Sequence, residues 1–159
     1  IFLPVQVAEK EAAQEQEALT TEAASTAGLL RGTRILLCED NMLNREIISE
    51  ILSSRGILVD TAENGQKGLE LFSREKPGTY QAILMDIRMP VMDGYQTTAR
   101  IRARKDSYSQ TIPILALSAD AYEESIQKSL DSGMTDHLTK PIENTKLFQS
   151  LQKYILPLK

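Results

Sequence analysis

The sequence predicts an open α/β fold with a parallel sheet, and two features of the chain carry this prediction. From Arg34 onward, short apolar runs recur that are typical of strands buried on both faces. Amphipathic segments with helical spacing separate these runs. Because strand and helix alternate five times, we expect a doubly wound sheet with helices on both faces.

Each expected strand is an apolar run bounded by polar residues or turn signals. The runs are Ile35–Cys38, Ile57–Val59, Ala82–Met85, Ile112–Leu117 and the short His137–Leu138. The spacing of apolar residues predicts helices over about residues 43–52, 66–72, 95–101, 122–130 and 147–155. In the first of them, Leu43, Ile47, Ile48, Ile51 and Leu52 share one face, which we expect to be buried.

The N-terminal part has a different composition. Residues 1–28 hold five glutamates against Lys10 as the only basic residue, so they account for the whole net charge of −4. Leu19 is the only large apolar residue of Ala8–Gly28, which predicts an acidic linker with some helical character. We therefore divide the chain into residues 1–32 and a folded domain over residues 33–159.

Composition excludes several classes of function. The folded part is electrically neutral, which gives no reason to expect nucleic-acid binding. The single cysteine, Cys38, excludes an internal disulfide and a cysteine metal cluster. No apolar run approaches the roughly 20 residues that cross a bilayer, so we expect a cytoplasmic domain without membrane contact.

Polar residues follow four of the expected strands. Ligands of open α/β sheets bind beyond the carboxyl ends of the strands. Glu39 and Asp40 follow the first strand, Asp86 the third, Ser118 the fourth and Lys140 the fifth. Each is ordinary alone, since an acidic pair can be a turn and Asp40 or Ser118 can cap a helix. Together they place three carboxylates, a hydroxyl and an ammonium at one edge of the sheet.

This inventory suits phosphoryl transfer. Three neighbouring carboxylates repel one another by roughly 1–4 kcal/mol per pair, and a hard divalent cation such as Mg²⁺ removes that penalty. Lys140 and Ser118 can bind phosphoryl oxygens. A carboxylate nucleophile beside Mg²⁺ and lysine is equipped for in-line displacement at phosphorus.

Four segments resemble the receiver domains of two-component response regulators. They are ILLCEDNMLN (35–44), AILMDIRMPVMDG (82–94), ILALSADA (114–121) and GMTDHLTKPI (133–142). The resemblance covers residues 33–156 and is strongest to the C-terminal receivers of hybrid sensor histidine kinases. It implies a flavodoxin-like, five-stranded parallel sheet ordered 2-1-3-4-5, with five helices.

The resemblance also implies roles for individual residues. Asp86 would accept the phosphoryl group from a phosphohistidine. Asp40 and Asp86 would ligate Mg²⁺ directly, together with the backbone carbonyl of Arg88, and Glu39 would act mainly through water. Lys140 would hold one phosphoryl oxygen.

Four further positions belong to this implied picture. Ser118 would bond a second phosphoryl oxygen and report phosphorylation to the fourth helix, fifth strand and fifth helix. His137 replaces the usual tyrosine or phenylalanine of the family's switch position, which puts the aromatic switch in doubt. Arg88 and Asp120 would flank the phosphoryl group, and their pairing would make the phosphorylated form long-lived.

The implied partners are a histidine kinase domain and a histidine phosphotransfer protein. Ile1–Pro4 resembles the last strand of a kinase ATP-binding domain, so residues 1–32 are predicted to be the tail of a preceding domain plus the linker. One rival is an aspartate-based phosphatase, but that class needs a second aspartate where Arg88 stands. The other is a pseudo-receiver, an interaction module that acts without phosphorylation.

Overall fold

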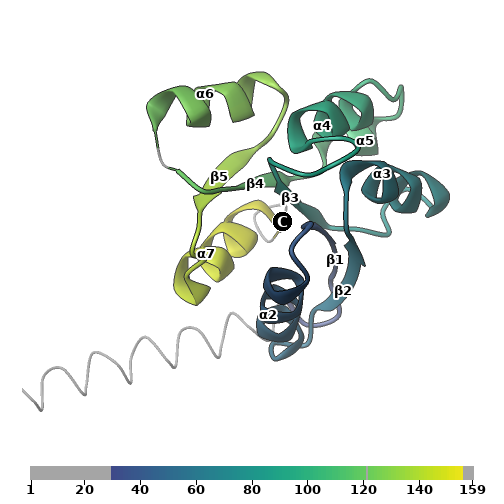
Figure 1. Ribbon diagram of the computed structural model, residues 1–159. Coiled ribbons are helices and arrows are strands. Elements are labelled where there is room, and N and C mark those ends of the chain that lie inside the picture. Colours follow the sequence, from purple (N-terminus) through teal and green to yellow (C-terminus); the bar gives the residue numbers. More distant parts are fainter. Residues whose placement is uncertain (1–29, 121, 156–159) are drawn as a thin grey trace, which may run out of the picture.

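A single parallel sheet lies between two layers of helices in the computed structural model, which describes residues 30–120 and 122–155 (Figure 1). The sheet has the order β2-β1-β3-β4-β5, as predicted. Its strands are β1 Arg34–Cys38, β2 Leu58–Ala62, β3 Ala82–Asp86, β4 Ile114–Ser118 and β5 Asp136–Thr139. This order brings the carboxyl ends of β1 and β3 side by side, because Cys38 lies opposite Met85.

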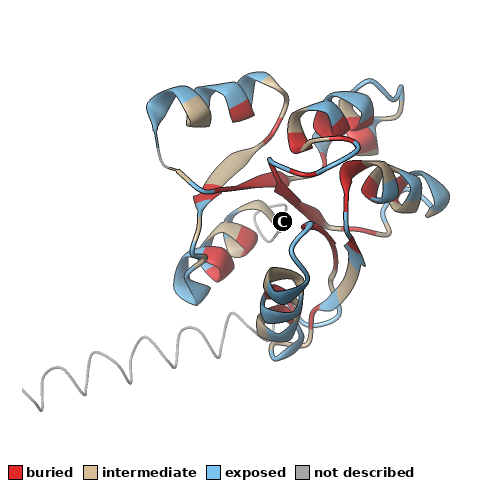
Figure 2. Ribbon diagram, in the orientation of Figure 1, coloured by how far each residue is buried: buried red, intermediate tan, exposed pale blue. Residues whose placement is uncertain are grey.

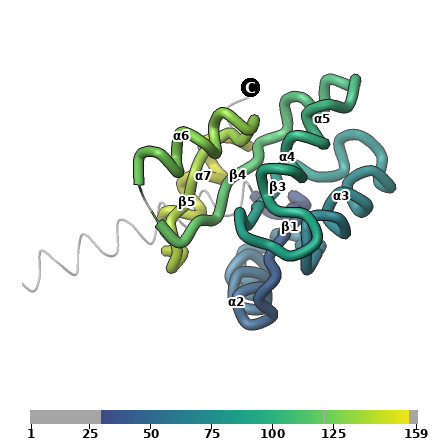
Figure 3. Tube along the Cα trace, turned by 45° about the horizontal axis from the view of Figure 1, so that its top comes forward, coloured from purple at the N-terminus to yellow at the C-terminus, as the bar shows by residue number. Residues whose placement is uncertain are grey.

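The helices divide between the two faces of the sheet. They are α2 Met42–Ser53, α3 Gly65–Arg74, α4 Gly94–Arg102, α5 Ser107–Thr111, α6 Glu123–Asp131 and α7 Asn144–Ile155. α2 and α7 cover one face, while α3 and α4 lie on the other, as Figures 1 and 3 show from two directions. Each face encloses its own apolar cluster.

The expected count of five helices is wrong for the described residues, which contain six. The additional helix is α5, whose polar sequence SYSQT has no apolar period to reveal it. It is held locally because Asp106 accepts hydrogen bonds from the backbone N–H and the hydroxyl of Ser109, at 2.8 and 2.9 Å. It is held from outside by Tyr108, whose ring stacks on Phe72 with centroids 5.4 Å apart.

The central strands are the most completely buried part of the described residues (Figure 2). Every residue of β3 and β4 is buried, and successive side chains alternate between the two clusters. Leu84 and Leu115 face α2 and α7, whereas Ile83 and Met85 face α3 and α4. Because their side chains are buried on both faces, these strands hold the residues at their carboxyl ends in fixed positions.

The predicted acidic linker and the remnant of a preceding domain lie in residues 1–29, outside the described residues. The division at residue 32 therefore stays a prediction. Leu30 is fully buried in the cluster beneath α2 and α7. Among the helices of the described residues, none combines the length and apolar character that crossing a bilayer would require.

Candidate functional site

The connection between β1 and α2 holds two acidic residues in fixed positions. Asn41, not Asp40, caps α2, because its side chain accepts the backbone N–H of Asn44 at 3.0 Å. The Arg45 guanidinium donates to the carbonyl oxygens of Glu39 and Asp40, at 2.9 and 3.1 Å. The local backbone is thus tied down without using the Asp40 carboxylate, which stays exposed at the sheet edge.

Three carboxylates converge at this edge, as the sequence predicted. Glu39, Asp40 and Asp86 each offer an oxygen atom, and these atoms lie within 4.8 Å of one another. Glu39 is fully buried and Asp86 is 4% exposed. Glu39 Oε1 accepts the N–H of Asn41 at 3.2 Å, and the buried Glu39 Oε2 lies 3.0 Å from the Lys140 ammonium.

The donor set fits a magnesium ion. A hard divalent cation prefers carboxylate and carbonyl oxygens and tolerates bound water. Three carboxylate oxygens lie in one small volume, and two of them belong to buried groups, Glu39 and Asp86. Such a cation would neutralise this arrangement. The loop after β3 adds a second constraint, because α4 starts very close to the strand end. A Cβ on Gly94 would lie only 2.3 Å from the Asp86 carbonyl oxygen.

Lys140 brings the compensating positive charge. Its ammonium lies 3.0 Å from Glu39 Oε2 and 3.2 Å from Asp86 Oδ2. The backbone places it there, since the Lys140 N–H donates to the Ser118 carbonyl at 2.6 Å and continues the pairing of β4 with β5. Lys140 precedes a cis peptide bond to Pro141.

The electrostatics of the site favour the neutral form of Asp86 when no metal is bound. Burial, reinforced by the negative charge of Glu39, raises the pKa of Asp86 to about 7, although the Lys140 ammonium acts in the opposite direction. Burial also acts to lower the pKa of Lys140, but the two carboxylates outweigh it and raise that pKa. The lysine therefore stays charged while Asp86 can change its protonation near neutral pH.

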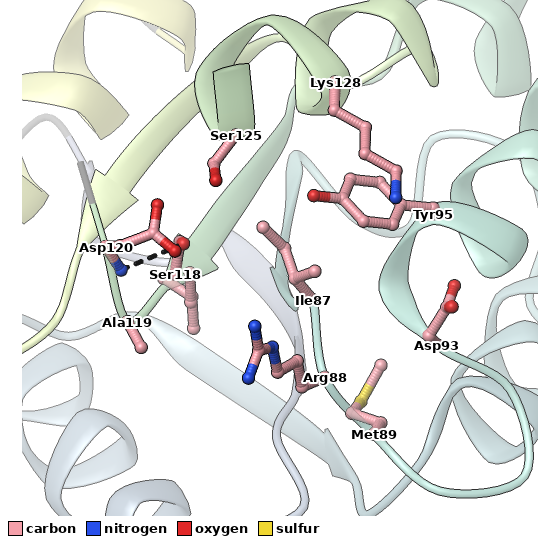
Figure 4. A pocket seen from close by; sticks show the side chains of 11 residues that line it. Ile87, Arg88, Met89, Asp93, Tyr95, Ser118, Ala119, Asp120, Ser125 and Lys128 are labelled. Carbon is pink, nitrogen blue, oxygen red and sulfur yellow. Dashed lines mark hydrogen bonds between the residues drawn. The ribbon is translucent and has the colours of Figure 1, made fainter. Parts of the chain in front are cut away.

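Ser118 lines a cavity of about 560 Å³. It is buried, and its Oγ accepts the backbone N–H of Asp120 at 3.3 Å. Figure 4 shows Arg88 and Asp120 on the wall of the same cavity, next to Ser118. Arg88 is exposed, and no ion pair joins it to Asp120 among the described contacts. The predicted pairing of these two residues is thus not formed in this state.

His137 lies on β5, opposite Ala116. Its side chain is half-buried, and burial lowers its pKa while Asp120 and Asp136 act in the opposite direction. Its Nε2 atom is buried without a hydrogen-bond partner. The sequence identified the position but could not show this environment.

One part of the first helix differs from expectation. Ile48 and Leu52 are buried, but Leu43 and Ile47 are 63% and 47% exposed, so the predicted apolar face is only partly covered. Met42 is 65% exposed beside them. We call Met42, Leu43 and Ile47 the α2 rim. A cavity of about 430 Å³ adjoins it, which Ile47 lines together with Lys140, Pro141 and Ile142.

The model of one protein family matches this chain over residues 35–152, and its description is "Response regulator receiver domain". The chain belongs to the response regulator receiver domain family. The receiver is similar to a probable histidine kinase 2 of Oryza sativa, with 35% identity over 77% of this chain and 13% of the relative. It is 41% identical to the peroxide stress-activated histidine kinase mak1 of Schizosaccharomyces pombe, over 70% of this chain and 7% of the relative.

The receiver therefore spans only a small part of these curated relatives, several of which are hybrid histidine kinases or are named as histidine kinases. Solved structures extend the comparison. The receiver domain of a Pseudomonas aeruginosa sensor histidine kinase, with magnesium coordinated in its active-site cleft, is 39% identical with a TM-score of 0.70. The match covers 78% of this chain and 98% of that one.

A second solved structure contains a partner. The receiver domain of the Saccharomyces cerevisiae response regulator Ssk1, crystallised with the histidine phosphotransfer protein Ypd1, is 27% identical with a TM-score of 0.70. The match covers 79% of this chain and 90% of that one. This chain is thus a receiver domain of two-component signalling, related to the receivers of hybrid histidine kinases.

Proposed function

We propose that this receiver accepts a phosphoryl group from a phosphohistidine onto Asp86 in a Mg²⁺-dependent reaction. The observation that carries the proposal is the grouping of Glu39, Asp40 and Asp86 within 4.8 Å, with the Lys140 ammonium 3.2 Å from Asp86 Oδ2. A carboxylate nucleophile with a cation on one side and a metal-binding pair on the other has the parts that phosphoryl transfer requires.

The residues divide the work as follows. Asp40 and Asp86 would hold Mg²⁺ directly with the backbone carbonyl of Arg88, while Glu39 would act through water. When bound, the ion supplies positive charge to the transferring phosphoryl oxygens. The Asp86 carboxylate attacks phosphorus, the P–N bond to the donor imidazole breaks, and its electron pair returns to the ring nitrogen.

Two side chains stabilise the charge on the phosphoryl group. The Lys140 ammonium is already directed at Asp86 Oδ2 and needs little rearrangement to reach a phosphoryl oxygen. The Ser118 hydroxyl accepts from the Asp120 N–H, so its own proton stays available to a phosphoryl oxygen. Groups positioned before the reaction contribute most to transfers of this kind, because no reorganisation is needed at the transition state.

The partner in this proposal is a histidine phosphotransfer protein, with the α2 rim as part of the docking surface. The rim lies next to the site, since Ile47 and Lys140 line the same cavity. Exposed apolar side chains gathered in one place mark interaction surfaces more often than scattered ones do. The complex of Ssk1 with Ypd1 supports a partner of this class. The kinase relatives support a donor kinase domain in a longer parent protein.

Intact-mass measurement tests the acceptor. We expect incubation with acetyl phosphate and Mg²⁺ to add one phosphoryl group, and EDTA or the Asp86→Asn substitution to abolish the gain. A gain that persists in Asp86→Asn would refute the assignment of the acceptor. Failure to gain the group and to bind beryllium fluoride, a phosphoryl mimic, would favour the pseudo-receiver alternative.

A further inference from the structure

Arg45 lies at the end of the first turn of α2, and the proposed transfer reaction does not use it. The residue is half-buried, and it takes part in none of the ion pairs that the described residues form. The helix dipole favours anions rather than cations at this end of a helix, so α2 itself does not explain an arginine here. The contacts of the guanidinium give the explanation.

Those contacts are two backbone carbonyl groups, one on either side of Asp40. A single guanidinium nitrogen, Nη1 of Arg45, donates to the Glu39 carbonyl at 2.9 Å and to the Asp40 carbonyl at 3.1 Å. The first carbonyl belongs to the peptide unit that precedes Asp40, and the second belongs to the unit that follows it. Because peptide units are planar, holding both of them restrains the backbone dihedral angles of Asp40 and therefore the direction of its side chain.

Asp40 depends on this support more than the other two carboxylates do. It is exposed, and the bond from Arg45 is its one side-chain hydrogen bond within the described part of the chain. Glu39 and Asp86 are buried, and they share the Lys140 ammonium at 3.0 and 3.2 Å. Two of the three carboxylates are thus held by burial and an ion pair, whereas the third is held through its backbone.

We propose that Arg45 is a positioning residue that holds the Asp40 carboxylate in place for Mg²⁺. The three carboxylate oxygen atoms lie within 4.8 Å of one another, which requires the Asp40 side chain to point toward the two buried groups. A ligand that is already oriented loses less conformational freedom when the ion binds, so the affinity is higher. This inference rests on the proposed function, because it concerns the ion that the transfer reaction needs.

The sign of the effect separates positioning from simple electrostatics. The guanidinium is a cation near a cation site, so its charge alone opposes Mg²⁺ binding. If only this charge mattered, Arg45→Met would bind Mg²⁺ more tightly. Losing the bonds to the two carbonyls acts in the opposite direction, since groups that orient metal ligands change metal affinity by roughly 10- to 100-fold. We therefore expect weaker binding.

Titration calorimetry with Mg²⁺ measures this effect directly. Arg45→Met should raise the dissociation constant about tenfold. The same substitution at Arg100, an exposed residue of α4, should leave the dissociation constant unchanged and serves as the control. An unchanged or smaller dissociation constant in Arg45→Met would overturn the inference. It would leave the proposed function standing, provided that the unsubstituted receiver binds Mg²⁺.

A second measurement distinguishes positioning from a general defect of the fold. The initial rate of phosphorylation by acetyl phosphate is recorded across a range of Mg²⁺ concentrations. In Arg45→Met, the half-saturating concentration should rise about tenfold, while the rate at saturating Mg²⁺ stays close to that of the unsubstituted receiver. A lower saturating rate with an unshifted Mg²⁺ dependence would overturn the inference, because Arg45 would then only support the fold. An unsubstituted receiver that binds no Mg²⁺ would overturn the proposed function as well.

Discussion

Asp86 is held in surroundings that work against its own charge. It is 4% exposed, Glu39 stands beside it, and the Lys140 ammonium is shared between the two carboxylates. Such an arrangement is unfavourable for an isolated domain and favourable once a divalent cation binds. A carboxyl group with such an unfavourable electrostatic environment is typical of a functional site.

Removing that charge should stabilise the metal-free receiver. Asp86 binds a proton up to about pH 7 in the folded domain, but only up to its ordinary value of 3.8 in the unfolded chain. Folding takes up a proton between these values, so this contribution to stability falls as pH rises through the window. In EDTA at pH 7.5 we expect Asp86→Asn to unfold at a higher temperature than the unsubstituted domain. The gain in the free energy of unfolding should be at most about 4 kcal/mol.

The same measurement at lower pH provides the control. The advantage of Asp86→Asn should shrink steadily as the pH falls from 7 toward the ordinary value of 3.8, below which Asp86 is mostly protonated in both states. Glu124→Gln, on the exposed surface of α6, should show no such trend. An advantage independent of pH would mean that the charge on Asp86 is not its cause.

Arg88 controls the lifetime of the phosphorylated form in our interpretation. It lines the same cavity as Ser118, and in this interpretation the attacking water enters through that cavity. We expect Arg88→Ala to shorten the half-life of phosphorylated Asp86 several-fold, measured by loss of the added mass after removal of the donor. An unchanged half-life would leave Arg88 as a solvated side chain. Arg100→Ala, an exposed residue near the end of α4, is the matched control.

At the scale of elements, α4 illustrates how a helix start defines the acceptor's position. Gly94 is the first residue of the helix, and its N–H donates to the Ile87 carbonyl at 2.8 Å. Asp93 and Gln96 form a capping box that holds this end. The absence of a side chain at Gly94 lets the helix begin directly against the end of β3.

Gly94→Ala should disturb both stability and the site. The added Cβ would meet the Asp86 carbonyl oxygen at 2.3 Å, and a backbone atom of the central strand has little room to yield. We expect a loss of about 1–3 kcal/mol in chemical denaturation, with weaker Mg²⁺ binding. Ala99→Ser, on the exposed side of α4, should leave both unchanged. If Gly94→Ala bound Mg²⁺ with unaltered affinity, the start of α4 would not determine the position of Asp86.

Substitutions on the α2 rim should affect partner binding rather than stability, because its side chains contribute little to the core. Leu43→Glu places a charge on a residue that is 63% exposed, so the melting temperature should change little. Phosphoryl transfer from phosphorylated Ypd1 should slow about tenfold or more, while phosphorylation by acetyl phosphate should not change. Ser53→Glu, at the far end of the same helix, serves as control. Equal slowing with both donors would point to damage at the site.

At the scale of the whole molecule, the site joins elements that are distant in sequence. Its residues lie at the carboxyl ends of β1, β3, β4 and β5. An ion bound to Asp40 and Asp86 would join the β1–α2 connection to the third strand. A ligand that binds only the folded state stabilises all of these elements together.

Mg²⁺ should therefore raise the melting temperature of the entire domain. At a concentration 100 times the dissociation constant, we expect about 2.7 kcal/mol of added stability. The affinity should rise with pH up to about pH 7 and then level off, because Asp86 must lose its proton to bind the ion. Calorimetry is suited to the measurement, since the chain has no tryptophan. EDTA should reverse the effect, and an effect that persists in Asp86→Asn would place the ion elsewhere.

The sheet and the composition of the site could be predicted from the sequence alone. Continuous apolar runs are readable because a strand buried on both faces needs an apolar residue at nearly every position. The residues that follow those runs are readable for the same reason, since the first polar side chains must emerge at the strand ends. Glu39, Asp86 and Lys140 could be found together before any coordinates, because parallel strands bring their carboxyl ends to one edge.

Features that depend on neighbours far away in sequence could not be predicted before the fold was known. α5 has no apolar period and depends on Asp106 and on the packing of Tyr108, so periodicity could not reveal it. Leu43 and Ile47 are exposed although they share the apolar face of α2 with the buried Ile48 and Leu52, and helical spacing does not encode this difference. The unpaired Nε2 of His137 arises from burial between strands and connections. Periodicity reports which way a side chain points along its own element, whereas burial and charge are set by what the rest of the chain brings against it.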